Sequence, residues 1–288
     1  VSVASGVFTD AAGNANADGS EANNSVTFSV DTVVPTISLS SNKTNLITGD
    51  SATLTFTLSE ASTAFTASDV TVAGGSISNF AGSGTTYTAT FTPTANSTAN
   101  GVVSVASGVF IDAAGNANAD GLDANNSVSI AVDTVAPTVS VSANKTSLIA
   151  GDTTTLTFTL SEASTTFTAA DVTVSGGVLS SFAGSGTNYT ALFTPTANST
   201  ASGAVSVASG VFTDSAGNAN ADGADTNNAI SLVVDTAVPT IALSTGKSSL
   251  IAGESTTLIF LLSEASTTSS MKSSITQLMR RSPDIAPK

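Results

Sequence analysis

Residues 51–60 read S-A-T-L-T-F-T-L-S-E, and the pattern returns at 153–162 as T-T-T-L-T-F-T-L-S-E. Leu54, Phe56 and Leu58 alternate with threonines, which is the period of a β-strand with one buried face and one solvated face. No segment of the chain has the 3.6-residue period of an amphipathic helix. The quoted stretch therefore predicts a strand, and its return predicts an all-β chain built from repeats.

The spacing of 102 residues is that of a whole small domain. The octapeptide VSVASGVF occurs three times, at 1–8, 103–110 and 205–212. Residues 31–132 and 133–234 align without a gap and are identical at 76 of 102 positions. Solenoid repeats are shorter, about 20–45 residues, whereas about 100 residues is a common domain size. We therefore infer a tandem duplication of one domain.

The repeat predicts five segments, with boundaries at the D-T-x-x-P-T motifs. They are the C-terminal end of a truncated repeat at 1–30, complete repeats at 31–132 and 133–234, the N-terminal part of another repeat at 235–267, and a non-repeat tail at 268–288. The tail breaks the pattern and is predicted to be disordered or a truncation artefact. Val1 opens in mid-motif without a signal peptide, so we expect the sequence to be a piece of a longer chain.

Each complete repeat is predicted to hold seven strands. In the first repeat they lie at about 36–41, 51–58, 69–73, 76–81, 85–92, 102–107 and 126–132. Glycine, asparagine and aspartate mark the turns between them, and the longest connection is 111–125. Seven short strands in about 100 residues fit an immunoglobulin-like sandwich. The predicted fold class is therefore all-β, with tandem immunoglobulin-like β-sandwich domains of 102 residues each.

The predicted core of the first repeat takes the apolar residues of these strands. They are Ile37, Leu39, Leu54, Phe56, Leu58, Val70, Val72, Phe80, Tyr87, Phe91, Val103, Val105, Phe110, Val128 and Ile130.

The composition excludes several kinds of site. The 288 residues include no His, Cys or Trp, so a Ser-His-Asp triad, a Cys nucleophile, a Cys/His zinc site and disulfides are ruled out. The 21 acids against 7 bases give a formal charge of −14. This charge disfavours nucleic acid and anionic membranes as partners, because both need basic patches. No apolar stretch is long enough to predict a membrane span.

Carboxylates are predicted to gather at one end of each sandwich. In the topology of a seven-stranded sandwich, the start of the first strand lies beside the second and the last inter-strand loops, and six of the seven acids of residues 31–132 fall in these places. Six carboxylates without a nearby base repel one another, and a hard cation with oxygen ligands would remove that cost. The alternative is a solvated acidic loop whose Asn and Asp residues serve turn geometry.

The last loop of the first repeat contains a short metal-binding pattern. Residues 116–121 read N-A-N-A-D-G, which has the spacing of an EF-hand start. The first position is Asn116 rather than Asp, and position 12 is Ser127 rather than Glu, so the segment is not an EF-hand. What it shares with one is alternating oxygen-bearing side chains on a turn that ends in glycine.

Four motifs in a fixed order carry a family resemblance. D-T-x-x-P-T, F-T-L-S-E-A-S, F-T-A-S-D-V-T-V-A-G-G and V-F-I-D-A-A-G-N together resemble the bacterial immunoglobulin-like repeats of large secreted or cell-surface adhesins of the RTX type, over residues 1–267. The resemblance implies an extracellular or surface-located stalk of many domains, often exported by a type I route, with Ca²⁺ near the domain junctions. It implies ligand roles for Glu60, Asp69, Asp112 and Asn116. The complete candidate set is Asp31, Glu60, Asp69, Asp112, Asn116 and Asp120 in the first repeat, and Asp133, Glu162, Asp171, Asp214, Asn218 and Asp222 in the second.

The sequence thus predicts a structural spacer of a bacterial surface adhesin, not an enzyme, stiffened by calcium and supporting cell adhesion or biofilm formation. Its partners would be neighbouring repeats of the same chain, with surface glycans or proteins reached through domains outside this sequence. A carbohydrate- or protein-binding module of a larger extracellular protein is the alternative, because loops on a sandwich can bind many ligands. Paired carboxylates of a glycosidase are disfavoured, because no aromatic platform accompanies them.

Overall fold

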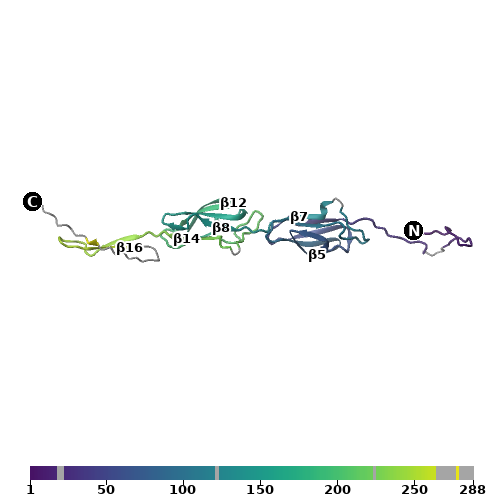
Figure 1. The fold of residues 1–288 in the computed structure, drawn as a ribbon, viewed down its shortest axis with the longest axis horizontal. Coiled ribbons are helices and arrows are strands. Elements are labelled where there is room, and N and C mark those ends of the chain that lie inside the picture. Colours follow the sequence, from purple (N-terminus) through teal and green to yellow (C-terminus); the bar gives the residue numbers. More distant parts are fainter. Residues whose placement is uncertain (18–22, 121–122, 223–224, 264–276, 279–288) are drawn as a thin grey trace. The chain divides into compact units, whose positions relative to one another are not determined.

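The computed structural model describes residues 1–17, 23–120, 123–222, 225–263 and 277–278 (Figure 1). These residues form strands, with three single-turn 3₁₀ helices. The chain divides into two compact units, one of residues 1–46 and 50–132 and the other of 47–49 and 133–288. The predicted all-β class with tandem sandwiches is confirmed.

The first sheet of the first unit is antiparallel. Its order is β1-β3-β5, with β1 at Ile37–Ser41, β3 at Ala52–Ser62 and β5 at Gly75–Pro93. Phe56 lies opposite Leu39 on β1 and Tyr87 on β5, so the alternation in the sequence becomes one apolar face across three strands. The predicted strands 76–81 and 85–92 are both parts of the single element β5.

The second sheet supplies the other half of the sandwich. Its order is β2-β7-β6-β4, with β2 at Asn45–Leu46, β7 at Ser127–Val132, β6 at Gly101–Val105 and β4 at Val70–Ala73. β2 runs parallel to β7, and the other pairs are antiparallel. 3₁₀ turns at Ala67–Asp69 and Ala124–Asn126 precede β4 and β7.

Both sheets contribute to one core. Ten of the fifteen predicted core residues are buried, and the other five pack partly buried against them: Leu39, Val70, Val72, Phe80 and Val128. Phe65 is at the centre of an aromatic group, with ring centroids 5.1 to 5.6 Å from those of Phe56, Phe80, Tyr87 and Phe110. Each such pair contributes about 0.5–1.5 kcal/mol beyond the burial of apolar area.

The second unit repeats this arrangement. One sheet has the order β12-β10-β8, with β12 at Gly177–Pro195, β10 at Thr154–Ser164 and β8 at Val139–Ala143. The other has the order β11-β13-β14-β9, with β11 at Val172–Ser175, β13 at Gly203–Val207, β14 at Ala229–Asp235 and β9 at Ser147–Ile149. A 3₁₀ turn at Ala169–Asp171 precedes β11. Phe158 lies opposite Val141 and Tyr189, which is the register of the first unit moved by one repeat.

The flanking segments do not close a sandwich within the described residues. Residues 1–17 and 23–30 hold only the isolated bridges Ser2–Ser25 and Thr9–Ala15. Near the other end, β15 at Thr240–Thr245 pairs with β16 at Thr257–Ser263. Ile241 and Leu243 on β15 are mostly exposed, although the equivalent Ile37 and Leu39 pack in the core of the first unit.

The tail at 268–288 is described only at Gln277–Leu278, which form β17. β17 pairs with Thr257 and Leu258 of β16. The equivalent positions of β3 pair with β5, so β17 takes the edge of β16 that a complete repeat gives to β5. The prediction of disorder or artefact for the rest of the tail lies outside the described residues. No helix in the described parts of the chain is long and apolar enough to cross a membrane.

Candidate metal centre

A tight turn organised by Asp112 forms the base of the candidate centre. Oδ1 of Asp112 accepts the main-chain N–H groups of Ala114, Gly115 and Asn116 at 2.8, 2.7 and 2.9 Å. Oδ2 accepts the side-chain amide of Asn116 at 2.8 Å. These bonds, with the Asn116 side chain the strongest, lower the pKa of Asp112. The D-A-A-G-N motif is therefore a loop held around one ionised carboxylate.

The same turn occurs at each copy of the motif. Asp214 accepts the N–H groups of Gly217 and Asn218, and Asp10 accepts those of Ala12 and Asn14. Asp10 is exposed, and the described residues of its segment, 1–17 and 23–30, form isolated bridges rather than a sandwich. Local hydrogen bonds therefore suffice to form this turn.

The turn brings one carboxylate of each complete repeat beside two others. Ligand oxygens of Asp31, Glu60 and Asp112 all lie within 4.8 Å of one another. Asp31 comes from the segment before β1, Glu60 from β3 and Asp112 from the loop between β6 and β7. The second repeat gathers Asp133, Glu162 and Asp214 in the same way. We call these the first and second carboxylate clusters.

Both clusters carry uncompensated negative charge. Burial raises the pKa of Glu60, and the neighbouring Asp31 and Asp112 raise it further. The pKa of Glu162 is raised for the same reasons, with burial first and then Asp133 and Asp214. The single lysine of each repeat is bonded elsewhere, Lys43 to Asp50 and Lys145 to Asp152.

The geometry fits a hard cation. Ca²⁺ holds oxygen ligands at about 2.3–2.6 Å, so oxygens bound to one ion lie no more than about 5 Å apart. The oxygens of each cluster meet this limit. Three carboxylates, which can each bind through one or both oxygens, supply three to six of the six to eight ligands that Ca²⁺ takes.

Asn116 and Asn218 face their clusters as hydrogen-bond donors. Nδ2 of Asn116 donates to Oδ2 of Asp112 and, at 3.4 Å, to the main-chain oxygen of Asp31. Asn218 makes the corresponding bonds to Asp214 and Asp133. Its Oδ1 accepts the N–H of Thr48 at 2.8 Å within the second unit. In this arrangement both asparagines position the carboxylates.

Asp69 and Asp171 lie outside the clusters. Oδ2 of Asp69 accepts the main-chain N–H of Thr66 at 2.8 Å and its hydroxyl at 2.9 Å. Asp171 makes the same two bonds to Thr168. Each aspartate therefore closes a capping box on the 3₁₀ turn before the next strand.

Asp120 and Asp222 also lie outside the clusters, and the side chains of Asn118 and Asp120 in the N-A-N-A-D-G stretch bond to the main chain. Oδ1 of Asp120 accepts the N–H of Ile37 at 2.7 Å. Oδ1 of Asn118 accepts the N–H groups of Val109 and Phe110, and its Nδ2 donates to Ala106. Asn118 is 1% exposed, so it fills a buried gap in the loop. Its structural role, shared by Asn220, was not anticipated from the sequence.

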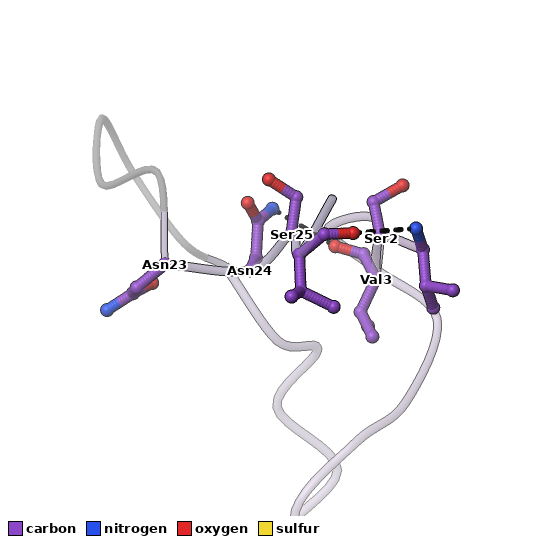
Figure 2. A pocket seen from close by; sticks show the side chains of 7 residues that line it. Ser2, Val3, Asn23, Asn24 and Ser25 are labelled. Carbon is purple, nitrogen blue, oxygen red and sulfur yellow. Dashed lines mark hydrogen bonds between the residues drawn. The ribbon is translucent and has the colours of Figure 1, made fainter. Parts of the chain in front are cut away.

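One hollow of about 260 Å³ lies in the N-terminal segment, between residues 1–3 and 23–26. Figure 2 shows Asn24 beside Val3, with its side-chain amide donating to the main-chain oxygen of Val3 at 3.0 Å. No acidic or basic side chain lines this hollow. It therefore offers no chemistry comparable with that of the carboxylate clusters.

Comparison with known proteins identifies a family and finds solved structures with partial similarity to the chain. The family model of the bacterial Ig-like domain matches residues 31–132 and 133–231. The adhesin FdeC of Escherichia coli is similar in structure, at 19% identity over 83% of this chain and 76% of its own, with a TM-score of 0.34. Invasin, a bacterial integrin-binding protein, is 14% identical over 78% of this chain and 47% of its own, with a TM-score of 0.36. The adhesin InvE of Yersinia pseudotuberculosis is 15% identical over 77% and 66%, with a TM-score of 0.28. No curated protein sequence matches the chain significantly.

Proposed function

Because the chain belongs to the family of bacterial Ig-like domains, we propose that it is a segment of the stalk of a bacterial surface adhesin, outside the cell. The observation that carries the proposal is the gapless tandem repeat of two sandwich domains. Each complete repeat has its own hydrophobic core. Between the end of β7 at Val132 and the start of β8 at Val139 there is no Gly/Ser linker.

Hydrogen bonds fix the end of the connecting segment, residues 137–138, to the second repeat. Pro137 has a fixed φ, and its main-chain oxygen accepts the N–H of Ala221 at 3.0 Å. Thr138 exchanges hydrogen bonds with Ser161. A chain held in this way suits a spacer better than a flexible tether. We therefore propose a structural role rather than a catalytic one.

We further propose that each carboxylate cluster binds one Ca²⁺ ion. Asp31, Glu60 and Asp112 would hold it in the first repeat, and Asp133, Glu162 and Asp214 in the second. The ion would neutralise three like charges and tie together the segment before the first strand, the second long strand and the last loop. Mg²⁺ would substitute poorly, because it requires shorter distances and near-octahedral geometry.

Calorimetric titration of the full chain with Ca²⁺ tests the metal site. We expect two sites in the complete repeats, one of which disappears when Asp112 is changed to Ala. Asp69→Asn is the matched control and should leave both sites, because Asp69 caps a 3₁₀ turn. Titration that shows no heat and no bound Ca²⁺ by equilibrium dialysis would refute the metal site.

Small-angle scattering tests the stalk. A spacer should give an extended particle, with a maximum dimension that Ca²⁺ increases and EDTA decreases. A compact particle insensitive to Ca²⁺ would refute the proposal. Retention of the chain on immobilised polysaccharide would instead favour the alternative, a carbohydrate-binding module.

A further inference from the structure

The loop between β6 and β7 is hydrogen-bonded to the segment that leads into β1. We call residues 31–36 and 133–138 the leaders of the two repeats. The main-chain N–H of Ala119 donates to the oxygen of Pro35 at 3.0 Å. One residue later, Oδ1 of Asp120 accepts the N–H of Ile37 at 2.7 Å. Two bonds thus join the end of the leader to a loop more than 80 residues away in sequence.

The position of β1 explains why Ile37 needs this partner. Among the described strands, β1 is an edge strand that pairs with β3 alone. Thr36 exchanges hydrogen bonds with Ser59 of β3, so by strand alternation the N–H of Ile37 points away from β3. Ile37 is 1% exposed, which leaves that N–H no water to bond. The Asp120 carboxylate fills this role.

The second repeat reproduces both bonds. Asp222 accepts the N–H of Val139 at 2.7 Å, and Ala221 donates to Pro137 at 3.0 Å. The exposed fractions of Asp120 and Asp222 are 7% and 6%. Oδ2 of Asp120 is buried without a hydrogen-bond partner, so Ile37 supplies the bond that stabilises this buried carboxylate.

We propose that Asp120 and Asp222 are mechanical latches that resist peeling of the leader when a repeat is pulled from its N-terminal side. Lifting the leader breaks the bond between the buried main-chain N–H and the buried carboxylate, which is costlier than the loss of one exposed hydrogen bond. Asp120 then has no other side-chain bond among the described residues, whereas Asp222 keeps a long one, 3.4 Å from Nδ2 of Asn220 to its Oδ2. The latch uses no side chain of the carboxylate clusters and therefore works without a cation. It rests on the proposed stalk role, because a stalk carries tension along the chain.

Force spectroscopy of the full chain in EDTA tests the latch. The chain has no cysteine, so an introduced cysteine defines a unique pulling point. Pulled through its termini, the unaltered chain should show two unfolding events of similar force, one for each complete repeat. In Asp222→Ala, one of the two should shift to lower force, with an unfolding rate constant about ten times higher. The other repeat is the internal control.

A second pulling geometry separates a latch from a general loss of stability. In this geometry the chain is pulled between its C-terminus and a cysteine introduced at Thr155, which is exposed on β10. The force then does not act on the leader of the second repeat. In this geometry Asp222→Ala should unfold at the same force as the unaltered chain. Equal loss of force in both geometries, or no loss in either, would overturn the proposal.

Two further variants check folding and specificity. Asp222→Asn keeps an oxygen that can accept the Val139 N–H, so its unfolding force should be close to that of the unaltered chain. This variant therefore tests the proposal even if Asp222→Ala folds poorly. Asp225→Ala is the matched control, because Asp225 is exposed in the same loop and, among the described residues, its side chain bonds to Asn227 alone. The two proposals fail on different measurements. A compact particle in small-angle scattering would refute the stalk, whereas the latch is refuted by the comparison of unfolding forces in the two pulling geometries.

Discussion

The ring of Phe91 occupies the space that a Cβ atom on Gly101 would need, with Cζ 2.4 Å from that position. A Cβ atom on Gly75 would lie 2.5 Å from the same ring atom. Phe91 is fully buried. The largest side chain of this part of the core is therefore accommodated by two residues without side chains, one on β5 itself and one on β6.

Gly101→Ala should destabilise the first repeat by about 1–3 kcal/mol, because an added methyl group forces the Phe91 ring out of its position. Urea unfolding of the full chain measures the change. Val102→Ala is the matched control. Its side chain is partly exposed, and the second repeat has Ala204 at this position, so the change should stay within about 0.5 kcal/mol. If Gly101→Ala left the free energy of unfolding unchanged, the Phe91 ring would be able to move aside without cost.

Alternation and repetition predict most of this fold, but they do not find Phe65. The strands around Leu54 and Val103 have clear two-residue periods, and their core residues were predicted. Phe65 follows β3 in a stretch of Thr and Ala without a period, yet it is 3% exposed and touches four other rings. β2 is also missed, because two residues are too few to show alternation.

Glu60→Gln should act in opposite directions with and without calcium. In EDTA it removes one of three mutually repelling carboxylates, so the melting temperature should rise. With Ca²⁺ at 100 times its dissociation constant, the unaltered site should gain about 2.7 kcal/mol, and the variant should lose most of that gain. Differential scanning calorimetry measures both effects.

Asp123→Asn is the control for this comparison. It removes one negative charge from the loop that carries Asp112, but Asp123 is exposed and outside the cluster. The gain with calcium should therefore be preserved. If both variants lost the gain equally, the ion would respond to the total charge of the loop rather than to a defined site.

The candidate site was only partly predictable, because the sequence does not reveal which oxygens the backbone already uses. Six acids were predicted at one end of the first repeat, and the structure gathers Asp31, Glu60 and Asp112. Asp69 accepts the main-chain N–H of Thr66, three residues earlier, and Asp120 accepts that of Ile37, which only the folded chain brings near. Spacing along the chain places a carboxylate in a loop, but the hydrogen-bond donors around it decide its role.

Acid should weaken the second repeat through Asp152. The N–H of Ile149 and then the ammonium of Lys145 lower the pKa of Asp152 below 3.8. Because the folded state binds this proton less tightly than the unfolded state, Asp152 stabilises the fold above about pH 3.8. That contribution is lost as the pH falls through the lowered pKa.

Urea unfolding between pH 7 and pH 3 measures the effect. The stability difference between the unaltered chain and Asp152→Asn should be largest near neutral pH and should shrink below pH 4. Because the Lys145–Asp152 pair is partly exposed, high salt should also reduce the difference. A difference that does not change with pH would show that folding does not lower the pKa of Asp152, and the prediction would fail.

Residues 31–132 expressed alone should fold cooperatively. All residues of the first hydrophobic core lie between Ile37 and Val132, and both sheets are complete within this range. Far-UV circular dichroism should show strands with little helix, and urea unfolding should follow one transition. Residues 235–267 are the contrasting fragment, because β15 and β16 leave Ile241 and Leu243 exposed, and a two-stranded hairpin is marginal in water. A broad, non-cooperative transition of residues 31–132 would mean that the sandwich depends on chain outside the repeat, and the division into self-sufficient domains that supports the stalk would then fail.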